Sequence, residues 1–244
     1  MLIDMERGSA MDDGVGQPAP GIINRENWIG ALPDSVRIAV EARMTSFAIE
    51  PGLPVKRAGE AATRIFQVES GFLSLIGLHA DGRQALITIY AAGNCFSETA
   101  MISRRMHNHT TIALTPAVMR QLDREDFWEL YHRHPEIPEA LCRKFAEAIS
   151  RQMASREQRA TQRLGKRVAM MFSNFAEHAG SGTGEGGVRI ALPITQSDIA
   201  DLFDVTRQSV HREVTYLKQL KLVDRHHKEW IILDPSRLRQ FCTY

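Results

Sequence analysis

Four side chains near the C-terminal end of the chain are of the types that read base edges in double-stranded DNA. They are Arg207, Gln208, His211 and Arg212. In a helix these positions would occupy the outer side of the first two turns. Arginine can bond bidentately to O6 and N7 of guanine, and glutamine to N6 and N7 of adenine. The pattern therefore predicts a helix whose N-terminal turns enter the major groove.

The residues around these four predict the helix-turn-helix that would position them. Thr195 and Asp198 have the spacing of a capping box at the start of a first helix. Asp204 stands in the turn, where a left-handed residue is needed, and Thr206 can cap the second helix. The apolar positions expected to face inward are Ile199, Leu202 and Phe203 in the first helix and Val210, Val214 and Leu217 in the second.

A segment of alternating character, residues 223–233, follows these helices and predicts a two-stranded wing. Its polar centre, Arg225 to Lys228, could reach the phosphate backbone. The alternative is that the helix carrying Arg207 to Arg212 only presents a polar face to solvent. This alternative does not explain why capping, turn and periodicity coincide there with outward basic and amide groups. The residues expected to contact DNA are Thr195, Gln196, Thr206, Arg207, Gln208, Ser209, His211, Arg212 and Lys228.

Upstream, from about residue 45 to residue 122, short apolar runs alternate with turn signals such as Pro51-Gly52 and Asp81-Gly82. A helix starting after Pro33 precedes them. Short strands at near-regular spacing are typical of an antiparallel barrel or roll, and Asp-Gly between two apolar runs favours a hairpin. The expected strands are residues 47–49, 65–68, 72–78, 85–90, 110–114 and 118–122.

A long helix is expected between the strand-rich region and the DNA-reading motif, because residues 126–162 contain no glycine and carry apolar residues three to four apart. About 25 helical residues measure roughly 37 Å, more than one side of a small roll. Such a helix usually packs against a copy of itself, although it could lie on its own domain. The expected homodimer contacts are Leu141, Phe145, Ile149, Gln152 and Met153.

After Gly165 a further helix is expected to end near Gly180. Residues 180–187 are glycine-rich and predict a flexible surface loop, and residues 188–192 predict a short strand. These elements would complete the DNA-reading domain.

Composition and charge restrict the class of protein. Residues 1–161 hold 18 basic and 20 acidic side chains, whereas residues 162–244 hold 12 and 9, the asymmetry expected of a DNA-binding end. No apolar run approaches the roughly 18 residues that span a bilayer, and the acidic N-terminus lacks the order of a signal peptide. We therefore expect a cytoplasmic protein without a membrane partner.

The chain also lacks the motifs of common catalytic and metal sites. GxSxG, P-loop and HExxH patterns are missing, so no catalytic residues are expected. Cys95, Cys142 and Cys242 are widely separated, which argues against a disulfide framework, a zinc site or an iron–sulfur cluster held by these cysteines. The pair His107 and His109 could chelate haem or a metal, but no Cys or carboxylate completes a recognisable set.

Together these patterns resemble the Crp/Fnr family of bacterial transcription regulators, the relatives of the cyclic-AMP receptor protein. The most specific match is ITQSDIADLFDVTRQSVHREV, residues 194–214. The resemblance implies an α+β fold with an N-terminal cyclic-nucleotide-binding-type β-roll, a long dimerisation helix and a C-terminal winged helix-turn-helix. It also implies a homodimer that binds palindromic DNA and contacts RNA polymerase. The expected boundaries are a flexible tail at 1–20, the roll at 21–125, the dimerisation helix at 126–162 and the DNA-binding domain at 163–244.

Departures from the family pattern bear on the effector. The family's Gly-Glu-Leu stretch appears here as residues 97–99, and its Arg-Ser pair appears as Asn108-His109. Losing that arginine removes the charge-assisted partner of a cyclic phosphate, which argues against cyclic AMP. In the recognition helix the family's Glu is Gln208, which predicts one altered base pair in each half-site. An effector, if one exists, is expected among Ser97, Glu98, Thr99, Asn108, His109, Gln152 and Met153.

Two alternatives remain for how such a regulator is controlled. The altered residues at 97–99 and 108–109 are compatible with a ligand-independent, constitutive protein whose roll only supports dimerisation. The nine histidines keep open a haem- or metal-based gas or redox sensor of the same family. The cofactor stays unknown at this stage.

Overall fold

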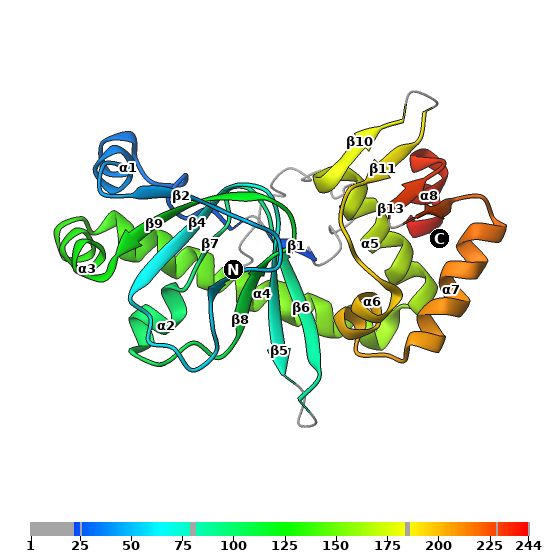
Figure 1. Cartoon of the computed structure of the whole chain (residues 1–244), viewed down its shortest axis with the longest axis horizontal. Helices are drawn as coiled ribbons and strands as arrows, with labels where there is room; N and C mark the ends of the chain where they lie inside the picture. Colours follow the sequence, from blue (N-terminus) through cyan, green and yellow to red (C-terminus); the bar gives the residue numbers. More distant parts are fainter. Residues whose placement is uncertain (1–21, 25, 79–81, 184–185, 228, 244) are drawn as a thin grey trace, which may run out of the picture.

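The computed structural model describes residues 22–243 except residues 25, 79–81, 184–185 and 228. The tail expected at residues 1–20 lies outside this range, as do Asp81 and Lys228. Figure 1 shows the strands β2 to β9 gathered on one side of the molecule and the helices α5 to α8 on the other, with α4 extending from the first group towards the second.

Two facing sheets form the N-terminal roll. One has the strand order β1-β6-β5-β8-β3 and the other β2-β9-β4-β7. The strands are β1 (Ile23–Asn24), β2 (Thr45–Ile49), β3 (Pro54–Lys56), β4 (Arg64–Ser70), β5 (Leu73–Leu78), β6 (Gln84–Tyr90), β7 (Cys95–Phe96), β8 (Thr110–Ala113) and β9 (Ala117–Asp123). All six expected strands are confirmed within a few residues.

The expected hairpin between the third and fourth of these runs is also confirmed. Strands β5 and β6 pair antiparallel, with Leu73 opposite Tyr90 and Leu78 opposite Gln84, and Gly82 takes a positive φ of 82° beside the turn. That conformation costs glycine little. Strand β6 of this hairpin lies against the C-terminal domain.

The inside of the roll is filled by aromatic rings. Phe66 and Phe96 stack at 5.3 Å between centroids, and Tyr90 stacks on Phe96 at 5.0 Å. Val68, Leu73 and Met119 are almost fully buried against them. The sheets therefore enclose a packed core rather than an open barrel.

Three short helices and the start of the long helix close one end of the roll. They are α1 (Asp34–Glu41), α2 (Glu98–Ser103), α3 (Arg124–Arg133) and α4 (Glu136–Thr161). The long helical region expected at 126–162 is thus divided: α3 ends before His134-Pro135, because proline lacks the N–H needed to continue a helix. Ile137 and Leu141 of α4 join the buried cluster that includes Trp28 and Phe127.

The C-terminal domain has the winged helix-turn-helix arrangement. Its elements are α5 (Leu164–Ala179), β10 (Gly180–Gly182), β11 (Val188–Ile190), α6 (Gln196–Phe203), α7 (Arg207–Gln219), β12 (Val223–His226), β13 (Glu229–Ile232) and α8 (Pro235–Thr243). The four strands form one sheet in the order β10-β11-β13-β12. The expectation of a flexible loop at 180–187 was wrong for its first residues, because Gly180–Gly182 pair antiparallel with β11.

One hydrophobic cluster joins the roll to the DNA-binding domain. Leu86 and Ile89 of the roll belong to the same buried cluster as Phe172 of α5 and Ile199 of α6. Arg167 of α5 also lies over the ring of Phe203, 4.7 Å from its centroid. The roll and the DNA-binding domain therefore share buried apolar surface.

Candidate nucleic-acid interface and effector region

The local structure of the helix-turn-helix agrees with the sequence signals in detail. Thr195 N donates to Asp198 Oδ2 at 2.7 Å and Asp198 N donates to Thr195 Oγ1 at 3.2 Å, a complete capping box. Asp204 is left-handed, with φ 54° and ψ 52°. Thr206 Oγ1 accepts from Ser209 N at 3.1 Å. Both caps satisfy backbone N–H groups that a helix start leaves unpaired.

Helix α7 has an inner face and an outer face, as its periodicity predicts. The side chains of Val210, Val214 and Leu217 are at most 1% exposed. Of the expected inward positions of α6, Ile199 is fully buried, whereas Leu202 and Phe203 are only partly buried. Buried contacts therefore fix α7 to the domain and leave its opposite side to solvent.

The outer side of α7 borders a surface hollow of about 490 Å³. It is lined by Gln196, Thr206, Arg207, Gln208, Ser209, His211 and Arg212. These are seven of the nine residues that the sequence assigned to DNA contact. Thr195 is instead occupied by the capping box, and Lys228 lies outside the described residues. His211 Nδ1 and Gln196 Oε1 are 3.3 Å apart, which links α7 to the start of α6.

The basic side chains of this hollow are free to bind an outside group. Arg207, Gln208, His211 and Arg212 are all exposed. Within the described part of the chain, neither Arg207 nor Arg212 has an ion-pair partner. Because no internal carboxylate neutralises them, both guanidinium groups remain available for a ligand such as a nucleic acid.

The wing is present but its centre differs from expectation. Strands β12 and β13 pair antiparallel, with Arg225 opposite Trp230. The Arg225 guanidinium lies over the Trp230 ring, 5.0 Å from its centroid, so Arg225 packs on its own domain. Trp230 Nε1 in turn donates to the Ile194 carbonyl at 2.8 Å, which ties the wing to the start of the helix-turn-helix. His226 and His227 are exposed at the tip.

In the roll, the carboxylate of Glu98 is buried and bonded within the protein. Glu98 is 2% exposed. Its Oε1 accepts from Trp28 Nε1 at 2.8 Å and from Lys144 Nζ at 2.9 Å. Two internal donors, one from the roll and one from α4, therefore hold this carboxylate oxygen.

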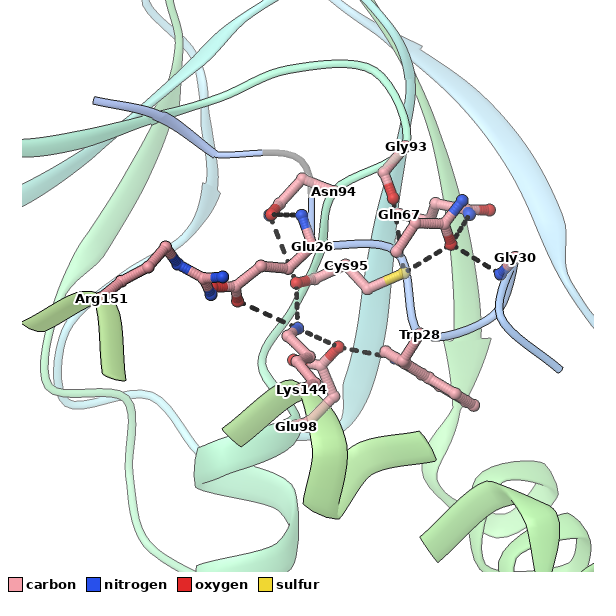
Figure 2. Close-up of polar contacts among 11 residues, drawn as sticks. Glu26, Trp28, Gly30, Gln67, Gly93, Asn94, Cys95, Glu98, Lys144 and Arg151 are labelled. Atoms are coloured by element: carbon pink, nitrogen blue, oxygen red, sulfur yellow. Dashed lines mark hydrogen bonds and ion pairs between the residues drawn. The ribbon is translucent and has the colours of Figure 1, made fainter. Parts of the chain in front are cut away.

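Lys144 links α4 to the roll through several acceptors. Its Nζ donates to the Cys95 carbonyl at 2.5 Å and lies 4.0 Å from Glu26 Oε2. Glu26 also forms an ion pair with Arg151, which lies about two helical turns after Lys144 in α4. Figure 2 shows the Lys144 ammonium between Glu26 and Glu98. Sequence reasoning missed this network, although Lys144 stands on the same helical face as Ile137 and Leu141, where a charged residue signals a buried partner.

Ser97, beside this carboxylate, has an unfavourable conformation. Its φ is 85° and its ψ −8°, in the left-handed region that glycine adopts most readily. Its Oγ is buried and has no hydrogen-bond partner among the described residues. Both features carry a free-energy cost.

The other expected effector residues do not converge on Glu98. His109 lies next to Lys56, whose Nζ donates to the His109 carbonyl at 2.7 Å, and Asn108 precedes His109 in the chain. Burial and the Lys56 charge lower the pKa of His107 to about 4, and they also lower the pKa of His109. Within the described residues no three His, Cys, Asp or Glu side chains group as a metal site would require.

A cavity of about 420 Å³ lies where the roll, α4, α5 and α6 meet. Thr99 and Gln152 line it together with Tyr90, Arg159 and Phe203. Ser97, Asn108, His109 and Met153 do not line this cavity. Only two of the seven expected effector residues therefore share it.

Helix α4 presents two different faces. Leu141 is 1% exposed and packs in its own domain, so its expected place in a dimer interface was wrong. Phe145 is partly buried against the same cluster. Ile149 and Met153, in contrast, are 55% and 66% exposed. Helix α4 therefore has one face that packs in its own domain and one apolar face that is exposed.

Two protein-family models match the chain. Residues 47–134 match the cyclic nucleotide-binding domain, and residues 166–241 match the Crp-like helix-turn-helix domain. The chain belongs to the Crp/Fnr family. As a member of that family it is a DNA-binding transcription regulator rather than an enzyme. No helix among the described residues is long and apolar enough to cross a membrane.

Similar proteins in the Crp/Fnr family match over most of the chain. The nitrogen fixation regulation protein FixK of Rhizobium meliloti is 26% identical over 195 residues, 80% of this chain and 85% of that protein. A CRP-like cAMP-activated global transcriptional regulator of Mycobacterium tuberculosis is 26% identical over 213 residues, 87% and 91% of the two chains.

Solved structures agree on the fold. FixK2 from Bradyrhizobium japonicum superposes with a TM-score of 0.66 at 18% identity, covering 81% of this chain and 96% of that one. A CRP/FNR-family transcriptional regulator from Thermus thermophilus gives 0.68 at 18% identity, with 82% and 99% covered. The expected α+β architecture of roll, long helix and winged helix-turn-helix is thus confirmed.

Proposed function

We propose that the protein regulates transcription as a homodimer that binds a palindromic DNA site through α7. The observation that carries this proposal is the hollow along α7, in which seven of the predicted contact residues lie together. Their exposure and their lack of internal ion pairs suit a polyanionic partner. At a promoter the bound dimer would meet RNA polymerase, the partner that the family resemblance implies.

Within the hollow, each residue type has a chemical role on DNA. Arg207 and Arg212 would bond to O6 and N7 of guanine, and Gln208 to N6 and N7 of adenine. Ser209 and Thr206 lie at the N-terminus of α7, where backbone N–H groups and hydroxyls favour a phosphate. Thr195 would support the site through its cap rather than through contact.

The homodimer is argued from the outer face of α4. Cys142, Ala146, Ile149 and Met153 are exposed and follow the three-four spacing of a heptad seam, and Ala160 continues it one heptad later, with the exposed Arg156 between them. This stripe lies opposite the face that carries Leu141 and Lys144. Two copies joined along it would present two α7 helices to one DNA duplex, which is why a two-fold site follows.

Control of the regulator is argued from Lys144. Because this lysine already supplies a cation to Glu98 and fixes α4 to the roll, we infer that DNA binding needs no cyclic nucleotide. The cavity that contains Thr99 and Gln152 offers a second candidate, an effector bound between the roll and α4. A rise in DNA affinity on adding a small molecule that contacts this cavity would favour the second candidate.

The base-reading role is tested with a DNA duplex that carries the site the protein prefers, as selected from random DNA. Binding of this duplex is measured by fluorescence anisotropy at fixed salt. A lost bidentate arginine contact costs about 1–3 kcal/mol, so Arg207→Ala and Arg212→Ala should each weaken binding roughly fivefold or more. Arg57→Ala, in the roll, removes the same charge outside the DNA-binding domain and should change affinity little. Equal losses in all three variants would contradict specific readout by α7.

A further inference from the structure

A second concave site lies on the outside of the roll, away from α7 and from Lys144. It is a pocket of about 430 Å³ between α2, α3 and the segment after α2. Its volume is within the range of small-molecule sites. Helix α2 separates it from the cavity at α4, since Thr99 lines that cavity whereas Ala100 and Met101 line this pocket.

The floor and one wall of this pocket are apolar. Ala62 and Met101 are each 2% exposed and form its floor. The Trp128 ring, which stacks with His132 at 5.6 Å between centroids, lines its wall and adds aromatic surface for an apolar group. Such a lining favours the apolar body of a ligand over a free inorganic ion.

The rim, in contrast, is strongly cationic. Arg104, Arg105 and Arg124 all line the pocket, and no acidic side chain is among its lining residues. Arg104 and Arg105 form no ion pair within the described part of the chain. Three like charges without a counter-charge repel one another, and a bound anion would relieve that repulsion.

One of the three guanidinium groups is already held in place. Arg124 Nε donates to the Ala62 carbonyl at 3.0 Å, and its Nη2 donates to the same oxygen. This leaves the N–H groups of Nη1 for another acceptor. A fixed guanidinium loses less side-chain entropy when it binds a carboxylate or a phosphate.

We propose that this pocket binds a small organic anion with an apolar, preferably aromatic, body and one carboxylate or phosphate head. The body lies on Met101 and Trp128 and the head meets the three arginines. The site differs from both the DNA interface and the expected effector region, and it does not depend on either being correct.

The test is isothermal titration calorimetry of the full chain with three matched probes. They are 2-naphthoate, 2-naphthyl phosphate and the neutral 2-naphthalenemethanol. The expected result is saturable binding of at least one anion at one site per chain, with the neutral probe bound at least about tenfold more weakly, because it offers no charged acceptor to the arginines. Whichever anion binds more tightly identifies the head group.

Substitutions then locate the binding. Arg104→Asn with Arg105→Gln removes two charges, and asparagine tolerates the left-handed φ of 55° at position 104; this variant should bind at least about tenfold more weakly. Arg57→Gln with Arg64→Gln removes two exposed arginines elsewhere on the roll and should bind like the wild type. Both variants can be checked for folding by circular dichroism.

Methyl resonances of ¹³C-labelled methionine supply an independent readout. Met101 and Met106 line the pocket and should shift on titration, whereas the exposed Met153 of α4 should not. The proposal is overturned by an absence of binding at millimolar probe, by equal binding in the two arginine variants, or by unshifted Met101 and Met106.

Discussion

At the scale of single residues, Ser97 shows how a substitution in the family's Gly-Glu-Leu stretch lowers the stability of the fold without changing its backbone. The family resemblance places a glycine at this position, and the left-handed backbone is retained with serine. A left-handed conformation costs a non-glycine residue about 1–2 kcal/mol. The buried hydroxyl adds a further penalty because its Oγ is unpaired among the described residues.

Ser97→Gly should therefore raise the free energy of unfolding by about 1 kcal/mol, after subtracting the roughly 0.5–1 kcal/mol of extra chain entropy that glycine brings. Urea denaturation followed by circular dichroism measures it. Ser97→Ala, which removes the hydroxyl but keeps the strain, should give a smaller gain. A loss of stability in the glycine variant would show that Ser97 is not strained.

His107 should make folding stability depend on pH. Burial, with the charge of Lys56, lowers its folded-state pKa to about 4 from an ordinary 6.5. Between these values the unfolded chain binds a proton that the folded chain does not, so stability falls as pH drops from about 6.5 towards 4.

Urea unfolding at a series of pH values from 7 to 4 measures this slope. His107→Gln, which cannot titrate, should flatten part of it. An unchanged slope in that variant would assign the acid sensitivity to other groups.

Gln208 should set one base preference in each half-site. Glutamine favours adenine, whereas the family's glutamate accepts from cytosine N4. Gln208→Glu should therefore shift the preferred base at one symmetric position, read by selecting sites from random DNA with both proteins. Selection of the same base by both would remove Gln208 from the base-reading set.

At the scale of elements, the helix-turn-helix was predictable because its signals are local. Capping at Thr195 and Thr206, the left-handed Asp204 and the buried stripe of α7 all depend on neighbours within a few residues. Strands β1, β3 and β7 have two or three residues each and are fixed by distant partners, so no local pattern reveals them. The strand β10 was missed for the same reason, since a glycine-rich segment has no side chains to signal pairing.

The effector region was predicted less well, because its key contact joins elements far apart in sequence. Glu98 and Lys144 are 46 residues apart, and a lysine within an amphipathic helix does not identify its partner. The resemblance matched Glu98 to the family's Gly-Glu-Leu stretch, and the structure puts it at the first residue of α2. It could not show that α4 supplies the cation.

The link between α4 and α2 should matter strongly for stability. Lys144→Met leaves the buried Glu98 carboxylate without its cation, which costs about 3–5 kcal/mol. Lys144→Met combined with Glu98→Gln should recover most of that loss, because the amide oxygen can still accept from Trp28. Additive losses in a double-mutant cycle by urea denaturation would mean that the two groups do not interact.

The outer face of α4 should hold two protomers together. Ile149→Glu or Met153→Glu would place a carboxylate in the shared seam, where an unpaired charge is costly to bury. Sedimentation velocity should then show monomer at concentrations where the wild type is dimeric. Ser150→Glu adds the same charge to an exposed position beside the stripe and should leave the dimer intact; if all three behave alike, the dimer uses another surface.

At the scale of the whole molecule, the roll and the DNA-binding domain are physically connected. Ile89 and Ile199 belong to one buried cluster, and Arg167 stacks on Phe203 at the same junction. A change in the packing of the roll can therefore reach α6 and α7 directly, as well as through α4. This arrangement suits a regulator in which the roll sets the position of the reading helix.

In the proposed function, two copies of α7 bind one DNA duplex without an added ligand. The most direct test is selection of binding sites from random DNA by the purified full-length protein, with no small molecule, at fixed moderate salt. We expect enrichment of a two-fold palindrome whose half-sites are about one helical turn, roughly 34–36 Å, apart. Enrichment of a single unrepeated half-site, or of no sequence at all, would contradict it.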